Sequence, residues 1–79
     1  METRLSGMKG LEIITDSGRR MGTAEDFIID LEKGEVVKIL LAPIGRLSGQ
    51  ELREFLATKS INYSRVRSVT DVIVISESK

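Results

Sequence analysis

Residues 11–41, with the sequence LEIITDSGRRMGTAEDFIIDLEKGEVVKILL, decide the fold of this 79-residue chain. Their apolar pattern predicts three strands in a row, over residues 11–15, 20–31 and 36–41. Two short turns join these strands, Asp16-Ser17-Gly18 and Glu32-Lys33-Gly34. Glycine suits such turns because it tolerates the left-handed backbone conformation that they require. The segment therefore predicts a β meander.

The middle strand of this meander is long for a small sheet, and its residues predict a bend. Gly22 lies inside it, which indicates a β-bulge or the close approach of another backbone. Asp30 leads through Leu31 into the second turn, where Gly34 is expected at the bulge position of a three-residue loop. Strands in small closed barrels need such bends.

One short helix is expected after the meander. Pro43 ends the third strand because proline has no N–H to donate to a sheet. Ser48 and Glu51 have the spacing of a capping box, which predicts a helix over about residues 49–57. The apolar stripe of this helix consists of Leu52, Phe55 and Leu56.

The chain then returns to strand over residues 61–69 and 72–75, with Asp71 in a tight corner between them. We therefore predict an all-β fold of five to six strands with one short helix, as a small strongly bent sheet or a β-barrel. At 79 residues the chain makes one domain, 1–79. Aromatic residues are only 4% of the chain, so the core is expected to be aliphatic.

Composition excludes several classes of function. Twelve basic residues balance twelve acidic ones, which argues against nucleic acid as a partner because such binding rests on neutralising phosphates. The absence of cysteine and histidine excludes thiol chemistry and the usual zinc ligands. No apolar run approaches the ~20 residues of a membrane helix. We expect a cytoplasmic protein that does not insert into a membrane and reaches one only through a partner.

Catalysis and metal binding have little support in the residue pattern. No serine has a histidine to activate it. Glu25 and Asp26 are neighbours on a predicted strand and point to opposite faces, so they do not form an acid–base pair. The aspartates lack the spacing of a calcium loop. We therefore expect no enzyme activity, no cofactor and no metal.

The apolar strands are more informative, because several carry apolar residues on both faces. One face fills the interior, and a single short helix offers only three strong apolar positions to cover the other. Self-association into a homodimer or a larger homo-oligomer is therefore favoured over coverage by the chain's own helix. The candidate interface residues are Phe27, Ile29, Leu40, Ile73 and Ile75.

Two arginines are candidate contacts for a further partner. Arg65 and Arg67 are two residues apart and would lie on one face of a single strand. No aromatic platform lies beside them in the sequence, so RNA binding by base stacking is not favoured.

Several motifs together resemble the PRC-barrel domain, a family named for the H subunit of the photosynthetic reaction centre. They are LSGMKGLEIITDSG at residues 5–18, RMGTAED at 20–26, the apolar run 27–30 with the following Gly34, and the closing segments 61–66 and 71–74. The resemblance covers about residues 4–76, which it implies as the core of the single domain. Asn62 stands where family members often carry proline.

The resemblance implies a small β-barrel-like domain that serves as an adaptor. Stand-alone archaeal members are implicated in cell division, where they link to the membrane-anchored SepF-like adaptor of the FtsZ ring. We therefore expect a non-enzymatic interaction module, recruited to the division site. The alternative is an RNA- or ribosome-associated module, which resembles the barrel of the ribosome-maturation factor and would use Arg65 and Arg67.

Overall fold

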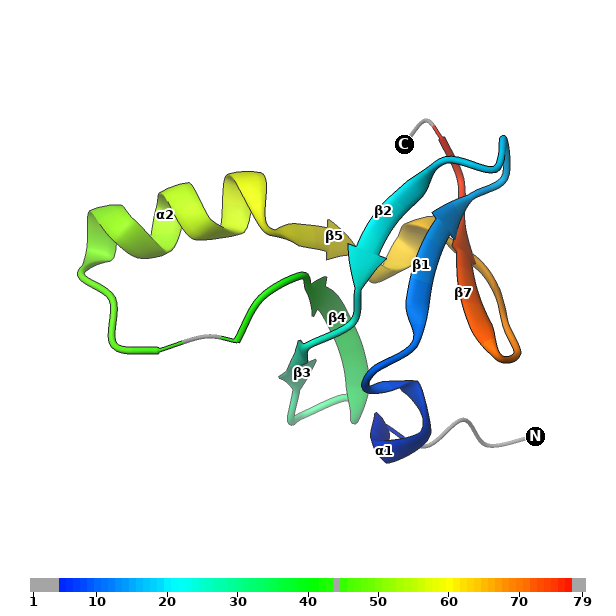
Figure 1. Cartoon of the computed structure of the whole chain (residues 1–79). Helices are drawn as coiled ribbons and strands as arrows, with labels where there is room; N and C mark the ends of the chain where they lie inside the picture. The colour runs from blue at the N-terminus through cyan, green and yellow to red at the C-terminus, as the bar shows by residue number, and fades with distance from the viewer. Residues whose placement is uncertain (1–4, 44, 78–79) are drawn as a thin grey trace.

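The structure is a computed structural model that describes residues 5–43 and 45–77. The strands are β1 Glu12–Thr15, β2 Arg20–Thr23, β3 Asp26–Asp30, β4 Glu35–Leu40, β5 Ser60–Asn62, β6 Val66–Val69 and β7 Val72–Ile75. The helices are α1 Leu5–Met8, α2 Gly49–Thr58 and the 3-10 helix η1 Tyr63–Arg65. Figure 1 shows how these elements are arranged.

The prediction of a mainly β fold is confirmed, but the strands are more numerous than expected. The described residues form seven strands in two sheets. One sheet has the strand order β2-β1-β7-β6 and the other the order β3-β4-β5. No closed barrel is detected among the described residues, which form two separate sheets. The expected core began at Arg4, which lies outside the described residues.

The first and last strands of the fold lie side by side (Figure 1). β1 pairs with β2 antiparallel and with β7 parallel, in a register that runs from Glu12 opposite Val72 to Thr15 opposite Ile75. β6 and β7 form a hairpin, and the N–H of Thr70 donates to the carbonyl of Val72 at 2.9 Å across its corner. The tight corner expected at Asp71 is therefore confirmed.

The single long strand predicted over residues 20–31 is wrong, because β2 and β3 belong to different sheets. The break lies at Ala24 and Glu25. The N–H of Ala24 donates to the carbonyl of Leu11 at 2.9 Å, and the N–H of Glu25 donates to that of Leu40 at 2.8 Å. Two successive backbone groups thus bond to different parts of the chain, and the strand passes from one sheet to the other.

The bulge predicted at Gly22 is confirmed. The β1–β2 register shifts between Ile13, which lies opposite Gly22, and Ile14, which lies opposite Arg20. Gly22 has a φ of +137°, a conformation that side chains of L residues rarely adopt. The first turn is confirmed as well, since Gly18 has a positive φ of 91° and donates its N–H to the carbonyl of Thr15 at 2.9 Å.

The turn between β3 and β4 is one residue longer than predicted. Asp30 and Glu35 are the last paired residues, so the loop is Leu31–Gly34. Oδ1 of Asp30 accepts from the N–H groups of Glu32 at 3.0 Å and Lys33 at 3.2 Å. Gly34 takes a positive φ of 66°, as expected, and donates its N–H to the Asp30 carbonyl at 2.8 Å. The Asp30 side chain thereby provides an acceptor for backbone N–H groups of the longer loop.

The strand predicted over residues 61–69 is interrupted. β5 ends at Asn62, and Tyr63–Arg65 form η1 before β6 begins. This turn carries the chain from the three-stranded sheet to the four-stranded one. The core between the sheets is aliphatic, as predicted. Its buried members are Met8, Ile13, Ala24, Ile39, Ile61, Ile73 and Ile75.

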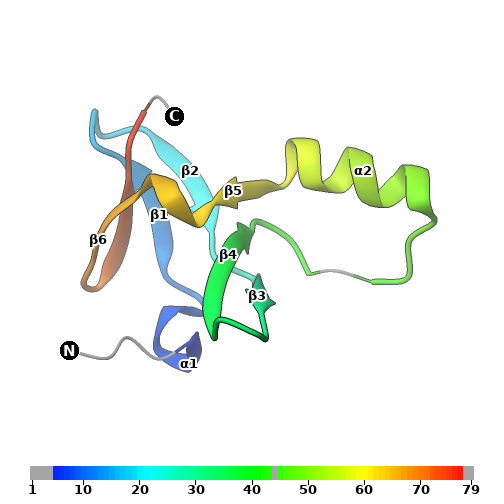
Figure 2. The ribbon, with the colours of Figure 1, turned by 180° about the vertical axis from the view of Figure 1, so that it is seen from behind.

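The helix predicted near residues 49–57 is confirmed as α2 and ends one residue later. Oγ of Ser48 accepts from the Glu51 N–H at 3.2 Å, and the Glu51 carboxylate accepts from the Ser48 N–H at 3.1 Å, which completes the capping box. Hydrogen bonds from the Ser48 backbone, and then from its side chain, lower the pKa of Glu51 below its ordinary value of 4.5. Figures 1 and 2 show α2 extending to one side of the sheets rather than lying over either.

Loss of this cap is expected to weaken α2. Ser48→Ala removes one half of the box and should destabilise the helix by about 1 kcal/mol, seen as lower helicity in far-ultraviolet circular dichroism. The matched control is Ser68→Ala, at an exposed serine in β6. Because the pKa of Glu51 is lowered in the folded chain, its contribution is present above pH 4.5 and is lost as the pH falls further. A helix signal that is equal in both variants would contradict this role of Ser48.

Candidate functional site

Most of the candidate interface residues lie inside the protein. Leu40, Ile73 and Ile75 are each 0% exposed, so the expectation that they project outward is corrected. Ile73 and Ile75 belong to the core cluster because they lie on the core-facing side of β7, where they alternate with the half-buried Val72 and Val74. Leu40 lies in β4, which is also interior, between β3 and β5. Phe27 is half-buried and packs against the core. Ile29 is the one member of the set at the surface, 37% exposed.

Ile29 belongs to β3 of the β3–β4 hairpin, which carries two further exposed apolar residues. Leu31 at its tip is 90% exposed and Val37 is 43% exposed. The β3–β4 register shifts between Ile28, opposite Lys38, and Ile29, opposite Val36, which leaves Val37 as an extra, bulged residue. We call Ile29, Leu31 and Val37 with the charged residues around them the hairpin surface. Those charged residues are Asp30, Glu32, Lys33 and Glu35, a net charge of −2.

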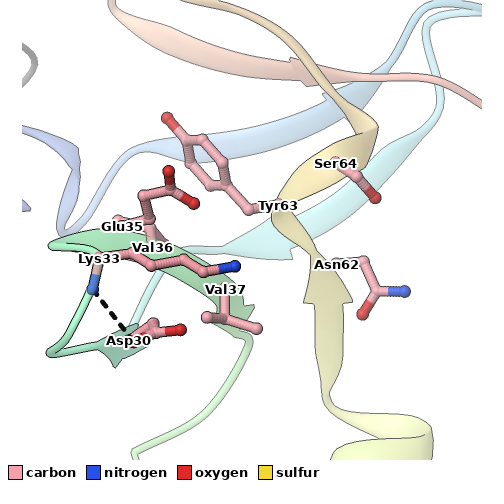
Figure 3. A pocket seen from close by; sticks show the side chains of 8 residues that line it. All are labelled: Asp30, Lys33, Glu35, Val36, Val37, Asn62, Tyr63 and Ser64. Atoms are coloured by element: carbon pink, nitrogen blue, oxygen red, sulfur yellow. Dashed lines mark hydrogen bonds between the residues drawn. The ribbon is translucent and has the colours of Figure 1, made fainter.

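A shallow hollow of about 530 Å³ adjoins the hairpin surface (Figure 3). β5 pairs with β4 only over residues 38–40, and the chain then turns away into η1. The half of β4 nearest the hairpin loop therefore faces an open space on this side. The hollow is lined by Asp30, Lys33, Glu35, Val36, Val37, Asn62, Tyr63 and Ser64.

The hollow combines apolar side chains with charged and polar ones. Figure 3 shows the Tyr63 ring beside Glu35, with the Lys33 side chain extending between them and Val37. Nζ of Lys38 donates to Oδ1 of Asn62 beside it. Among residues 5–43 and 45–77, no group of three or more acidic side chains is placed to hold a metal ion.

A second exposed apolar surface lies on α2 and the loop before it. Leu52, Phe55 and Leu56 are half-buried, no residue of α2 is buried, and the element that α2 contacts most is β5. Leu47 in the preceding loop is 36% exposed. We call residues 45–59 the arm. Its charged residues are Arg46, Glu51, Arg53, Glu54 and Lys59, a net charge of +1.

Sequence reasoning missed Leu31, Val37 and Leu47 as exposed apolar residues. Leu31 was assigned to the end of the strand predicted over residues 20–31, and Leu47 lies between the predicted third strand and helix, so neither was expected at an exposed apolar position. A leucine inside a hairpin loop of charged residues was the available indication, because loop tips are usually polar. A spacing of two residues would place Val37 on the same strand face as Ile39, but the bulge in β4 leaves Val37 out of the regular register.

The two candidate arginines are not brought together as predicted. Arg65 lies in η1 rather than on a strand with Arg67. Its Nη2 donates to the Ser76 carbonyl at 2.7 Å and to the Glu77 carbonyl at 3.2 Å. Arg67 is exposed on β6. Arg65 therefore bonds to the chain's own backbone, and of the two arginines proposed to contact RNA only Arg67 is exposed.

Arg65 is part of a wider anchor for the last described residues. Hydrogen bonding to Thr15 is the main cause that lowers the pKa of the Glu77 carboxyl, and Ser17, Arg19 and Arg65 act in the same direction. The Arg19 guanidinium lies 3.4 Å from this carboxylate. The segment after β7 is thus tied to the β1–β2 turn and to η1.

Arg65→Ala is expected to destabilise the fold, and Arg67→Ala is not. Loss of the charged donor to two backbone carbonyls should lower the free energy of unfolding by about 1–3 kcal/mol. Arg67→Ala, at an exposed position, should change it by less than about 0.5 kcal/mol. Urea unfolding followed by circular dichroism measures both, and equal losses would show that the Arg65 bonds do not stabilise the fold.

Comparison with known families identifies the class of this domain. The PRC-barrel domain model matches residues 1–79. The chain therefore belongs to the PRC-barrel family, in agreement with its strand and turn motifs. A search of curated proteins finds no match to the chain. No helix in its described part is long and apolar enough to cross a bilayer.

Proposed function

We propose that this chain is a non-enzymatic protein-interaction module that associates with further copies of itself. The observation that carries the proposal is the placement of the exposed large hydrophobic side chains. Within the described residues they are Ile29, Leu31, Val37 and Leu47, and all of them lie on the hairpin surface or the arm. Gathered exposed apolar residues usually mark an interaction site, whereas scattered ones do not. A net charge of zero also favours association between copies.

Sedimentation velocity of the purified chain tests self-association directly. Over a range from low micromolar to hundreds of micromolar, we expect the apparent mass to rise from that of one 8.8 kDa chain toward at least twice that value. A single monomeric species at every concentration would overturn the proposal of self-association.

As a finer proposal, the module works in archaeal cell division, on the cytoplasmic side of the division site. Its partner there would be a SepF-like membrane-anchored adaptor of the FtsZ ring. Membership of the PRC-barrel family, whose stand-alone archaeal members are implicated in cell division, supports this role, together with exposed apolar surface that a protein partner would cover. Isothermal titration of the purified chain with the SepF-like protein of the same cell is the test. Absence of binding heat, with both proteins folded, would contradict the division role and leave self-association standing.

A further inference from the structure

We propose that the arm of one copy docks on the hairpin surface of a second copy, and that the exchange is reciprocal. The inference rests on the proposed self-association and names the two surfaces that make it. The resulting assembly is a closed homodimer with two identical arm–hairpin contacts.

The arm needs a partner because its helix is too short to be stable alone. Isolated helices below about 12–15 residues are marginal in water, and packing of an apolar face supplies most helix stability in proteins. α2 has ten residues, none of them buried, and its stripe of Leu52, Phe55 and Leu56 is only half-covered within one chain. The capping box fixes where the helix begins but does not cover the stripe.

The hairpin surface likewise exposes apolar side chains to water. Leu31 is 90% exposed at the tip of the β3–β4 hairpin, and Ile29 in β3 and Val37 in β4 are 37% and 43% exposed. Covering these side chains with the arm stripe would remove apolar surface from water on both partners, which is the main driving force of association.

The charges select an arm–hairpin contact over contacts between like surfaces. The arm carries three basic and two acidic residues, and the hairpin surface carries one lysine and three carboxylates. Two arms would bring together surfaces of net positive charge, and two hairpins surfaces of net negative charge. The arm and the hairpin have opposite signs, and such complementarity fixes register and suppresses wrong pairings.

One chain does not make this contact with itself. The hairpin loop joins β4 at Glu35, and the arm leaves from the other end, after Leu40. At about 3.3 Å per residue, six residues separate the two ends by roughly 17–20 Å. Figures 1 and 2 show α2 extending away from the sheets, not toward the β3–β4 loop. The hairpin surface on which an arm docks therefore belongs to another copy of the chain.

Closure into a dimer follows from the small size of each contact. A ten-residue helix is about 15 Å long, too short for one contact to bury the roughly 800 Å² per partner of a standard interface. A two-fold axis doubles the contact, since each copy then supplies one arm and one hairpin. In an open head-to-tail assembly, each pair of neighbouring copies would share only one arm–hairpin contact.

A mixing experiment tests the exchange. The arm variant is Leu52→Gln with Arg53→Glu, and the hairpin variant is Leu31→Gln with Glu35→Lys. Each alone should raise the dimer dissociation constant at least tenfold in sedimentation equilibrium. Mixed one to one, they should form a heterodimer more tightly than either forms a homodimer, because the intact arm of one variant can dock on the intact hairpin of the other.

Arg67→Glu is the matched control, because it makes the same charge reversal at an exposed arginine outside both surfaces. It should leave the dissociation constant unchanged. Circular dichroism confirms that every variant is folded. Self-association that survives both variants would overturn the exchange and leave the proposed function intact. If mixing fails to restore association, the exchange is overturned in favour of contacts between like surfaces. A monomeric wild-type chain would overturn both proposals.

Discussion

Ile13→Ala is expected to lower the free energy of unfolding by about 2–5 kcal/mol, as large-to-small changes at fully buried sites do. Ile13 is 0% exposed, and it lies opposite Ile73 in the parallel β1–β7 pair. Removing most of its side chain leaves a cavity in an interior that holds few large residues. For a domain of this size the melting temperature should fall by about 10 °C or more.

The neighbouring isoleucine provides the matched control. Ile14 follows in the same strand, points to the opposite face and is half-buried. The same change to alanine should cost only about 1 kcal/mol, close to the typical effect of a single substitution. Urea unfolding of both variants, at a protein concentration low enough to hold the chain monomeric, measures the difference. Equal losses would contradict the placement of the core on one face of β1.

Gly22→Ala is expected to destabilise the chain by about 1–3 kcal/mol, the usual cost of a residue held in a sparsely populated backbone conformation. The φ of +137° at Gly22 is the source of this cost. Crowding is not, because an added Cβ would meet its nearest side-chain atom, Cδ2 of Leu41, at an ordinary contact distance of 3.8 Å.

Gly49→Ala separates the effect of backbone conformation from that of losing a glycine. Gly49 begins α2 with no unusual φ, and no atom lies within 4 Å of an added Cβ. Alanine there should be neutral or stabilise the chain by up to about 1 kcal/mol, because it restricts the unfolded state. Thermal unfolding of the two variants compares them. If Gly22→Ala unfolds at or above the temperature of the parent, the bulge does not require glycine.

Local chemistry predicted the features that depend on a few neighbouring residues. Gly18 and Gly34 mark their turns because the required backbone conformation is a property of the turn itself. Ser48 and Glu51 mark the start of α2 for the same reason, since both halves of the capping box lie within one turn of helix.

Features that depend on distant pairing were not visible in the local pattern. The break between β2 and β3 arises because Ala24 and Glu25 bond to segments far apart in the chain. Four β-branched residues in a row at 72–75 indicated two apolar faces, but not that β1 and β6 would flank the strand. Ile73 and Ile75 were expected at the surface, but they lie on the face of β7 that packs into the core. Neither strand propensity nor apolar periodicity predicted that Leu31 would be exposed.

The parallel pairing of β1 with β7 has a consequence for how the protein forms during synthesis. The β3–β4 hairpin joins neighbouring segments and can assemble as soon as residues 26–40 leave the ribosome. β1 emerges earlier but must wait for one of its two strand partners until residues 72–75 appear. Long-range pairing of this kind slows folding. From the time that β1 leaves the ribosome until β7 follows it, the edge of β1 that pairs with β7 is open, and a chaperone that shields such edges would act on it during that interval.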